Sequence, residues 1–102
     1  MSYEVIVTFT KTPESPADAF KTMPVLRAGV AGVTQEQIDT INELYPMTYE
    51  SREILDQRII HYTFPSKVEF DGRESDPSVA AFRAQRAAWA EANHITVALR
   101  VL

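Results

Sequence analysis

Residues 76–102 carry the structural signal that most constrains the fold of this sequence. Asp76 and Pro77 are typical of a helix start, because the carboxylate accepts hydrogen bonds from the first free backbone N–H groups and proline suits the first helical position. The alanine-rich stretch 77–92 then predicts a helix, and the alternation of apolar and polar residues over 95–102 predicts a strand. This part of the chain is therefore predicted to form a helix followed closely by a strand.

Three further strands are predicted upstream. Residues 3–10 alternate apolar and polar side chains, which is typical of a strand that is buried on one face. Two strand-like runs between residues 47 and 64 flank Asp56, which predicts a hairpin that turns at Asp56-Gln57. This turn lacks Asn-Gly or Asp-Gly chemistry, so the register stays open by a residue or two. With this turn, the cross-strand partners are Ile54 and Ile59, Arg52 and His61, and Glu50 and Thr63.

Two more helical segments are predicted from the capping residues at their N-termini. Thr34 and Gln37 match a capping box, in which each side chain accepts a hydrogen bond from the other residue's backbone N–H. The helix that they open ends at Pro46, because proline cannot continue a helix. Residues 66–72 begin with a serine and carry a glutamate three positions later, which predicts another short helical turn.

The segment 11–33 is harder to interpret, since it contains three prolines and two glycines. Residues 16–22 fit a short helix with Ser15 as its cap. Residues 25–33 are apolar apart from one arginine, and an apolar irregular segment is expected to pack as a lid over the core or a partner.

The order strand, helix, strand, strand, helix, strand predicts the ferredoxin-like βαββαβ sandwich, an α+β fold. Four antiparallel strands would form one sheet, with the helices on one face and the two terminal strands side by side. The 102 residues, of which 45% are hydrophobic, suffice for one core, so residues 1–102 are expected to form a single domain.

The second face of such a sheet is too apolar to meet only water. An uncovered face should be nearly all polar. Five apolar residues are nevertheless predicted on it, namely Ile6, Ile54, Ile59, Ala98 and Leu102. The simplest cover is a second copy related by two-fold symmetry, so we expect a homodimer that forms through the open sheet face.

The sequence resembles the dimeric α+β barrel family in the order of its elements, and most specifically in its final third. There Tyr62-Thr63-Phe64-Pro65-Ser66 leads through Phe70 into Ser75-Asp76-Pro77, an Ala/Arg-rich helix with Trp89 and a closing strand. The resemblance implies two ferredoxin-like sheets paired into a barrel and a small organic molecule as cargo. Any catalysis would be cofactor-free oxygenation, isomerisation or dehydration. The Pro/Gly-rich insertion at 11–33 departs from the family pattern of a single first helix.

The composition of the chain limits the kinds of partner and cofactor that the protein is expected to bind. Lys and Arg total 10 against 14 acidic residues, and the net charge of −4 argues against binding nucleic acid. The absence of cysteine excludes disulfides and Cys-based zinc sites, and with two histidines no metal site is expected. No apolar run approaches a membrane span, the start of the chain lacks a signal-peptide pattern, and the cytoplasm is the expected compartment. No cofactor is predicted.

His61 is the candidate catalytic residue. An unperturbed histidine has a pKa near 6.5, which suits proton transfer at neutral pH, and the predicted register puts Arg52 and Glu50 close to it. The alternative is that His61 makes hydrogen bonds in a dimer interface.

The candidate ligand-binding residues are Tyr49, Tyr62 and Arg86. The two tyrosines belong to the helix-facing side of the hairpin, where their hydroxyls would reach a cavity between sheet and helices. Arg86, together with Arg83, would clamp an anionic ligand from the last helix. The alternatives are core tyrosines with hydroxyls at the rim and solvated arginines on apolar stems.

Two functions remain open at this point. In the first, a small homodimer binds or transforms a small organic molecule in a pocket between sheet and helices. In the second, a non-enzymatic assembly or interaction protein, such as an accessory or viral factor, has the dimer itself as its function. No catalytic motif in the sequence decides between them.

Overall fold

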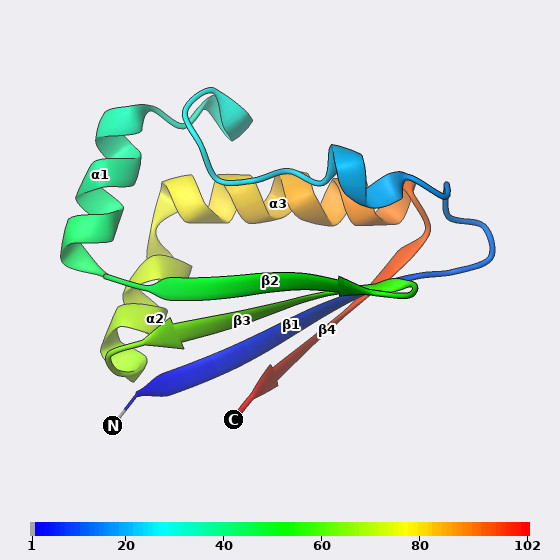
Figure 1. Cartoon of the computed structure of the whole chain (residues 1–102). Helices are drawn as coiled ribbons and strands as arrows, with labels where there is room; N and C mark the ends of the chain where they lie inside the picture. Colours follow the sequence, from blue (N-terminus) through cyan, green and yellow to red (C-terminus); the bar gives the residue numbers. More distant parts are fainter. Residues whose placement is uncertain (1) are drawn as a thin grey trace.

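The computed structural model describes residues 2–102 and contains one four-stranded antiparallel sheet in the order β2-β3-β1-β4. The strands are β1 (Tyr3–Lys11), β2 (Thr48–Ile54), β3 (Gln57–Phe64) and β4 (Ile95–Val101). The first and last strands lie side by side (Figure 1). This strand order, with helices between β1 and β2 and between β3 and β4, confirms the predicted ferredoxin-like α+β fold.

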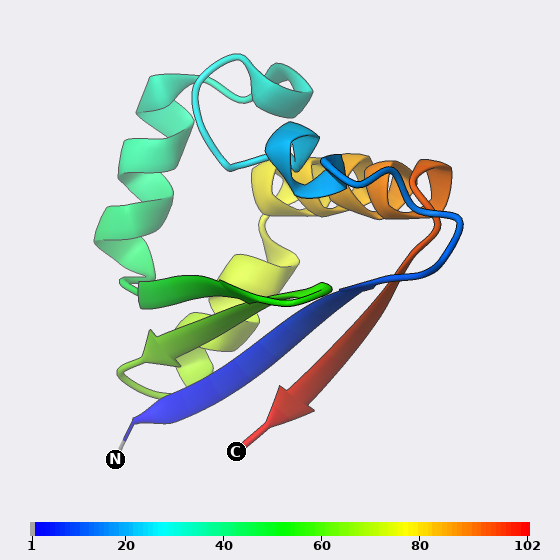
Figure 2. The same ribbon diagram turned by 45° about the vertical axis from the view of Figure 1, so that its right-hand side comes forward.

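The helices are α1 (Gln35–Leu44), α2 (Lys67–Ser75) and α3 (Pro77–Ala92), with short 3₁₀ helices η1 (Ala19–Thr22) and η2 (Val30–Gly32) before α1. Helix α3 runs along the sheet. Figure 2 shows α1 rising from the end of the sheet where β2 begins, rather than lying on the sheet beside α3.

The starts of α1, α2 and α3 are capped as the sequence indicates. The Thr34 side chain accepts from Gln37 N, and the Gln37 side chain accepts from Thr34 N, which completes the capping box of α1. Ser66 Oγ accepts from Val68 N at the start of α2, and Asp76 Oδ1 accepts from Ser78 N at 2.8 Å at the start of α3. These bonds satisfy N–H groups that have no partner inside the helix.

The core lies between the sheet and α3. It contains Val5, Val7, Phe9, Ala19, Phe20, Ile60, Phe64, Ala90 and Ile95. Alternate residues of β1 point into it, and Phe9 is only 1% exposed. Trp89 of α3 packs edge-on against Phe9, with ring centroids 6.2 Å apart, and also against Phe20 of η1, at 6.4 Å. The 3₁₀ helix η1 is thus fixed to the core by aromatic packing.

The hairpin register differs from the predicted one by two residues. Its two-residue turn is Leu55-Asp56, so Arg52 pairs with Ile59 and Glu50 pairs with His61. The physical reason is that Leu55 adopts the left-handed conformation, with φ 52°. Leucine rarely adopts this conformation, so the sequence does not predict a turn at this position. Because side chains alternate with a period of two, this shift leaves every residue on its predicted face.

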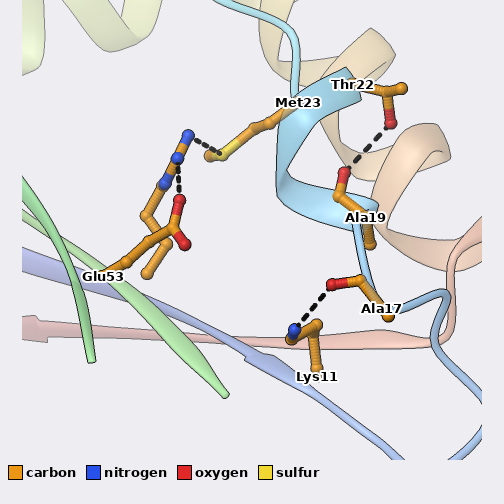
Figure 3. Close-up of polar contacts among 7 residues, drawn as sticks. Lys11, Ala17, Ala19, Thr22, Met23 and Glu53 are labelled. Atoms are coloured by element: carbon orange, nitrogen blue, oxygen red, sulfur yellow. Dashed lines mark hydrogen bonds and ion pairs between the residues drawn. The ribbon is translucent and has the colours of Figure 1, made fainter. Parts of the chain in front are cut away.

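The predicted helix 16–22 is shorter in the structure and is not capped by Ser15. The 3₁₀ helix covers only Ala19–Thr22. Ser15 Oγ instead donates to His94 O at 2.9 Å and accepts from Thr12 N at 2.9 Å, which joins this segment to the end of α3. Lys11 Nζ donates to Ala17 O at 3.0 Å, and Thr22 Oγ1 donates to Ala19 O at 3.0 Å (Figure 3).

Candidate functional site

A cavity of about 680 Å³ lies between the helix-facing side of the sheet and the helices. Its apolar lining comes from β1, β2, β3, α1, α2 and α3, and it includes Val5, Val7, Ile38, Ile60, Phe64, Phe70 and Phe82. Beside the cavity, the edge strand β2 is exposed along its whole length, and α1 stands at the end of the sheet (Figure 2). A volume in the range of ~300–1,000 Å³ is typical of small-molecule sites.

The apolar segment 25–33 covers this cavity only in part. Met23, Pro24, Val25 and Leu26 line the cavity, whereas residues 27–33 do not. The 3₁₀ helix η2 lies against α3, and Val33 just after it is buried. The prediction of a lid over 25–33 is therefore correct for its first two residues, and the remainder packs as part of the structure beside α3.

Arg86 and Tyr62 meet at the cavity wall. Arg86 Nη1 donates to Tyr62 Oη at 3.2 Å. The guanidinium lies over the ring of Phe9, with its carbon 5.1 Å from the centroid, and over the ring of Phe82, at 5.3 Å. Two aromatic faces and one hydrogen bond thus hold the Arg86 charge in one place, because cations are attracted to the negative faces of aromatic rings.

Tyr49 lies next to Tyr62 on the neighbouring strand. The two residues are direct cross-strand partners, and their ring centroids are 6.0 Å apart. Tyr49 is 56% exposed, which places it at the rim of the cavity. The structure therefore brings the three predicted ligand-binding residues, Tyr49, Tyr62 and Arg86, together on one side of the sheet.

Three further arginines line the cavity, and of these only Arg83 was predicted from the sequence to bind a ligand. Arg83 forms an ion pair with Glu74, and Arg58 forms one with Glu53. In Figure 3, Met23 and Glu53 approach the same polar group, which is the Arg58 guanidinium. The alternation of β3 was the available signal for Arg58, because it shares a face with Ile60 and Tyr62.

Arg73 of α2 is the most buried charge in the described chain, at 7% exposed. Its guanidinium donates to Asn42 Oδ1 at 2.8 and 3.2 Å and to Tyr45 O at 3.2 Å. Burial lowers the pKa of Arg73 below its ordinary value, and the charge of Asp76 opposes this effect. These bonds join α2 to the end of α1, so Arg73 supports the cavity wall.

His61 lies on the opposite face of the sheet. Its Nε2 is 2.9 Å from Glu4 Oε1, and Glu50 is its cross-strand neighbour on β2. A shallow hollow lies on this face, lined by Ile6, Glu50, Ser51, Arg52, Ile59 and His61. The structure therefore separates His61 from Tyr49, Tyr62 and Arg86 by the thickness of the sheet, so the predicted residues do not form one site.

The described residues contain no cluster of three His, Asp or Glu side chains that could hold a metal ion. Within 2–102, every helix is too short or too polar to cross a membrane.

Comparison with known proteins identifies the fold. No family model matches the chain, and no curated protein matches it. A solved structure of Rv0793 from Mycobacterium tuberculosis is similar over 100% of this chain and 93% of that protein, with a TM-score of 0.58 and 18% sequence identity. The chain shares its α+β fold with Rv0793. A putative amidohydrolase/peptidase from Burkholderia cenocepacia aligns with 99% of this chain but only 27% of its own length, at 13% identity and a TM-score of 0.42.

Proposed function

We propose that this protein binds a small organic molecule in the cavity between its sheet and helices, and that it works as a homodimer paired through the open sheet face. The observation that carries the proposal is the cavity itself, about 680 Å³ in volume and bounded by three strands and three helices. A concave opening of this volume with a mostly apolar wall is typical of a small-molecule site.

The lining favours an organic molecule over an inorganic ion. Most of the exposed wall is apolar, and among its polar groups Tyr62 and Arg86 are held in position by their hydrogen bond. Sites of this composition bind through apolar contact and orient the ligand with a small number of hydrogen bonds. As the resemblance to the dimeric α+β barrel family implies, the reaction proposed for this cavity is a cofactor-free oxygenation, isomerisation or dehydration.

The homodimer is supported by the composition of the open face. Ile6 and Ile59 lie half-buried in its centre, and Ile54 is 46% exposed. The His61–Glu4 pair lies next to this apolar centre. Burial of apolar area contributes roughly 25 cal/mol per Å², so a second copy placed over this face would stabilise both chains.

A thermal-shift screen with aromatic and quinone-like compounds tests the binding proposal. Ser51 lines the cavity from the exposed strand β2, so Ser51→Trp fills the cavity without disturbing the buried core. Ser75→Trp, at the exposed end of α2, is the matched control. We expect compounds that raise the melting temperature of the wild type and of Ser75→Trp but not of Ser51→Trp. An equal response from all three proteins, or none from the wild type, contradicts the proposal.

A second candidate function is a non-enzymatic assembly protein, which the apolar open face with its His61–Glu4 pair favours. Because His61 and Tyr62 point to opposite faces, their substitutions separate the two candidates. Loss of turnover or binding in Tyr62→Phe with the dimer intact supports the ligand-binding function. Loss of the dimer alone in His61→Ala, with Tyr62→Phe unchanged from the wild type, supports assembly.

A further inference from the structure

The arginines of the cavity differ in what neutralises them. Arg58 and Arg83 are paired with glutamates, and Arg73 donates its hydrogen bonds to neutral acceptors in the protein. Arg86 is half-buried, and its one hydrogen bond within residues 2–102 goes to the phenol oxygen of Tyr62. A guanidinium has five N–H donors, so four of those on Arg86 remain for another partner.

The position of Arg86 is fixed before any ligand binds. Its guanidinium is held over two aromatic rings and by the hydrogen bond to Tyr62. The phenol oxygen accepts that bond, and the Tyr62 O–H has no acceptor in the described part of the chain, so it is free to donate. Arg86 and Tyr62 together therefore present several free N–H and O–H donors beside one positive charge.

The charge around the cavity has the opposite sign to that of the whole chain. The chain carries a net charge of −4, yet the charged side chains that line the cavity are Arg58, Arg73, Arg83, Arg86 and Glu74. Partial removal from water strengthens the field of a charge, because the walls of a concave site have a low dielectric constant. An anionic group is therefore attracted into the cavity, where Arg86 has no carboxylate partner and, unlike Arg73, makes only one hydrogen bond to the described part of the chain.

The aromatic residues of the lining indicate the shape of the apolar part of the ligand. The aromatic side chains of Tyr49, Tyr62, Phe64, Phe70 and Phe82 surround the cavity. Aromatic rings pack well in offset or edge-on arrangements against other flat rings. A planar ring system matches this lining better than a flexible chain, which would lose more conformational freedom on binding.

We propose that the molecule bound in the cavity is a planar aromatic carboxylate. Its carboxylate accepts hydrogen bonds from Arg86 and from the Tyr62 O–H, and its rings lie against the aromatic lining. The planar fork of a guanidinium matches the two oxygens of a carboxylate, which explains an arginine at this position. This inference rests on the proposed function and names the class of its ligand.

Isothermal titration calorimetry with matched acids and amides tests the inference. The probes are benzoate, 2-naphthoate and anthracene-2-carboxylate, each paired with its neutral primary amide of the same shape. The wild type is expected to bind the best acid about tenfold to a hundredfold more tightly than its amide, the range for hydrogen bonds to a charged group. In Arg86→Gln this preference is lost, while the affinity for the amide changes little.

Two further variants keep the test independent of folding and of overall charge. Arg27→Gln removes the same charge from an exposed loop position outside the cavity lining, and its preference for the acid should equal that of the wild type. Tyr62→Phe keeps the ring and removes the hydroxyl, and the affinity for the acid should fall by about threefold to tenfold. Circular dichroism and thermal midpoints confirm that each variant is folded before titration.

The possible failures are distinguishable. Equal affinity for acids and amides, or an acid preference that survives in Arg86→Gln, overturns the carboxylate inference and leaves the proposed function standing. The same holds if neutral aromatic compounds bind and none of the acids does. If neither the probes nor any compound of the thermal-shift screen binds, the proposed function and this inference both fall.

Discussion

The ring of Tyr45 occupies the space beside Gly72 of α2 that a Cβ on that residue would fill. Next to this contact, Arg73 donates to the Tyr45 carbonyl and to Asn42 Oδ1. The end of α1 is thus joined to α2 by one close ring contact and a set of hydrogen bonds. Because α1 does not lie along the sheet (Figure 2), these contacts with α2 help to fix its position.

Replacing Gly72 by alanine should destabilise the protein. The new methyl group would displace the Tyr45 ring, and overpacking of this kind costs about 1–3 kcal/mol. Urea denaturation measures the change in the free energy of unfolding. In a Tyr45→Ala background the same substitution should instead stabilise by about 0.5–1 kcal/mol, since alanine is a better helix former than glycine. Destabilisation of equal size in both backgrounds would show that the ring contact is not the cause.

Arg73 is the second component of this junction, and Arg73→Met should destabilise the fold. The substitution keeps the buried aliphatic stem but removes the hydrogen bonds to Asn42 and Tyr45. Bonds to a charged group contribute about 1.5–3 kcal/mol, and the relief of desolvation offsets part of this, so a loss of about 1–3 kcal/mol is expected. Arg27→Met is the exposed control, for which the denaturation midpoint should move little.

Much of the fold was predictable from the sequence because its signals are local. The capping box of Thr34 and Gln37 and the Asp76-Pro77 start each depend on groups within one helical turn. The faces of the strands follow from alternation, which survives a register shift of two residues. Tyr49 and Tyr62 could therefore be assigned to the helix-facing side without coordinates.

The remaining features depend on contacts that are distant in sequence. Ser15 was predicted as a helix cap, but the carbonyl of His94 attracts its hydroxyl instead, a contact that spans most of the chain. The hairpin turn depends on the left-handed conformation of Leu55, which has no sequence signature for leucine. Arg73 was missed because its partners belong to another helix, so no local pattern marks it as buried.

The Asp76 cap should contribute measurably to stability. Asp76 Oδ1 accepts from Ser78 N at 2.8 Å, and from Val79 N at a longer distance of 3.4 Å. Removing such a cap costs about 0.5–2 kcal/mol, so Asp76→Ala should lower the free energy of unfolding by that amount. Asp76→Asn keeps an oxygen acceptor and should retain most of the stability. If the asparagine variant loses as much as the alanine variant, the charge rather than the cap is responsible.

The start of α2 should respond to acid. The hydrogen bond from Ser66 Oγ lowers the pKa of Glu69 below its ordinary value. A carboxyl group whose pKa is lower in the folded state stabilises the fold above its unfolded pKa, and this contribution is lost as the pH falls through the folded pKa. Carboxyl titration by NMR should show the pKa of Glu69 rising in Ser66→Ala. In the control Ser75→Ala, at the other end of the same helix, it should stay lowered.

The proposed dimer can be tested by placing a charge in the apolar centre of the open face. Light scattering at micromolar concentration should give about twice the chain mass of 11.5 kDa for the wild type. Ile59→Asp should give a monomer, because an aspartate at the centre of the paired faces would lose its hydration. Leu55→Asp is the matched control, since Leu55 is 92% exposed at the hairpin tip and its left-handed backbone suits aspartate.

The light-scattering results show whether the open sheet face is a dimer interface or only an apolar surface. A wild type that scatters as a monomer contradicts the proposed dimer directly. If Ile59→Asp and Leu55→Asp remain dimers alike, the chain pairs through some other surface than the open face. If Ile59→Asp alone dissociates and stays folded by circular dichroism, the apolar centre formed by Ile6 and Ile59 is the dimer contact. The ligand affinity of the resulting monomer then shows whether the cavity on the opposite face binds its ligand without the partner.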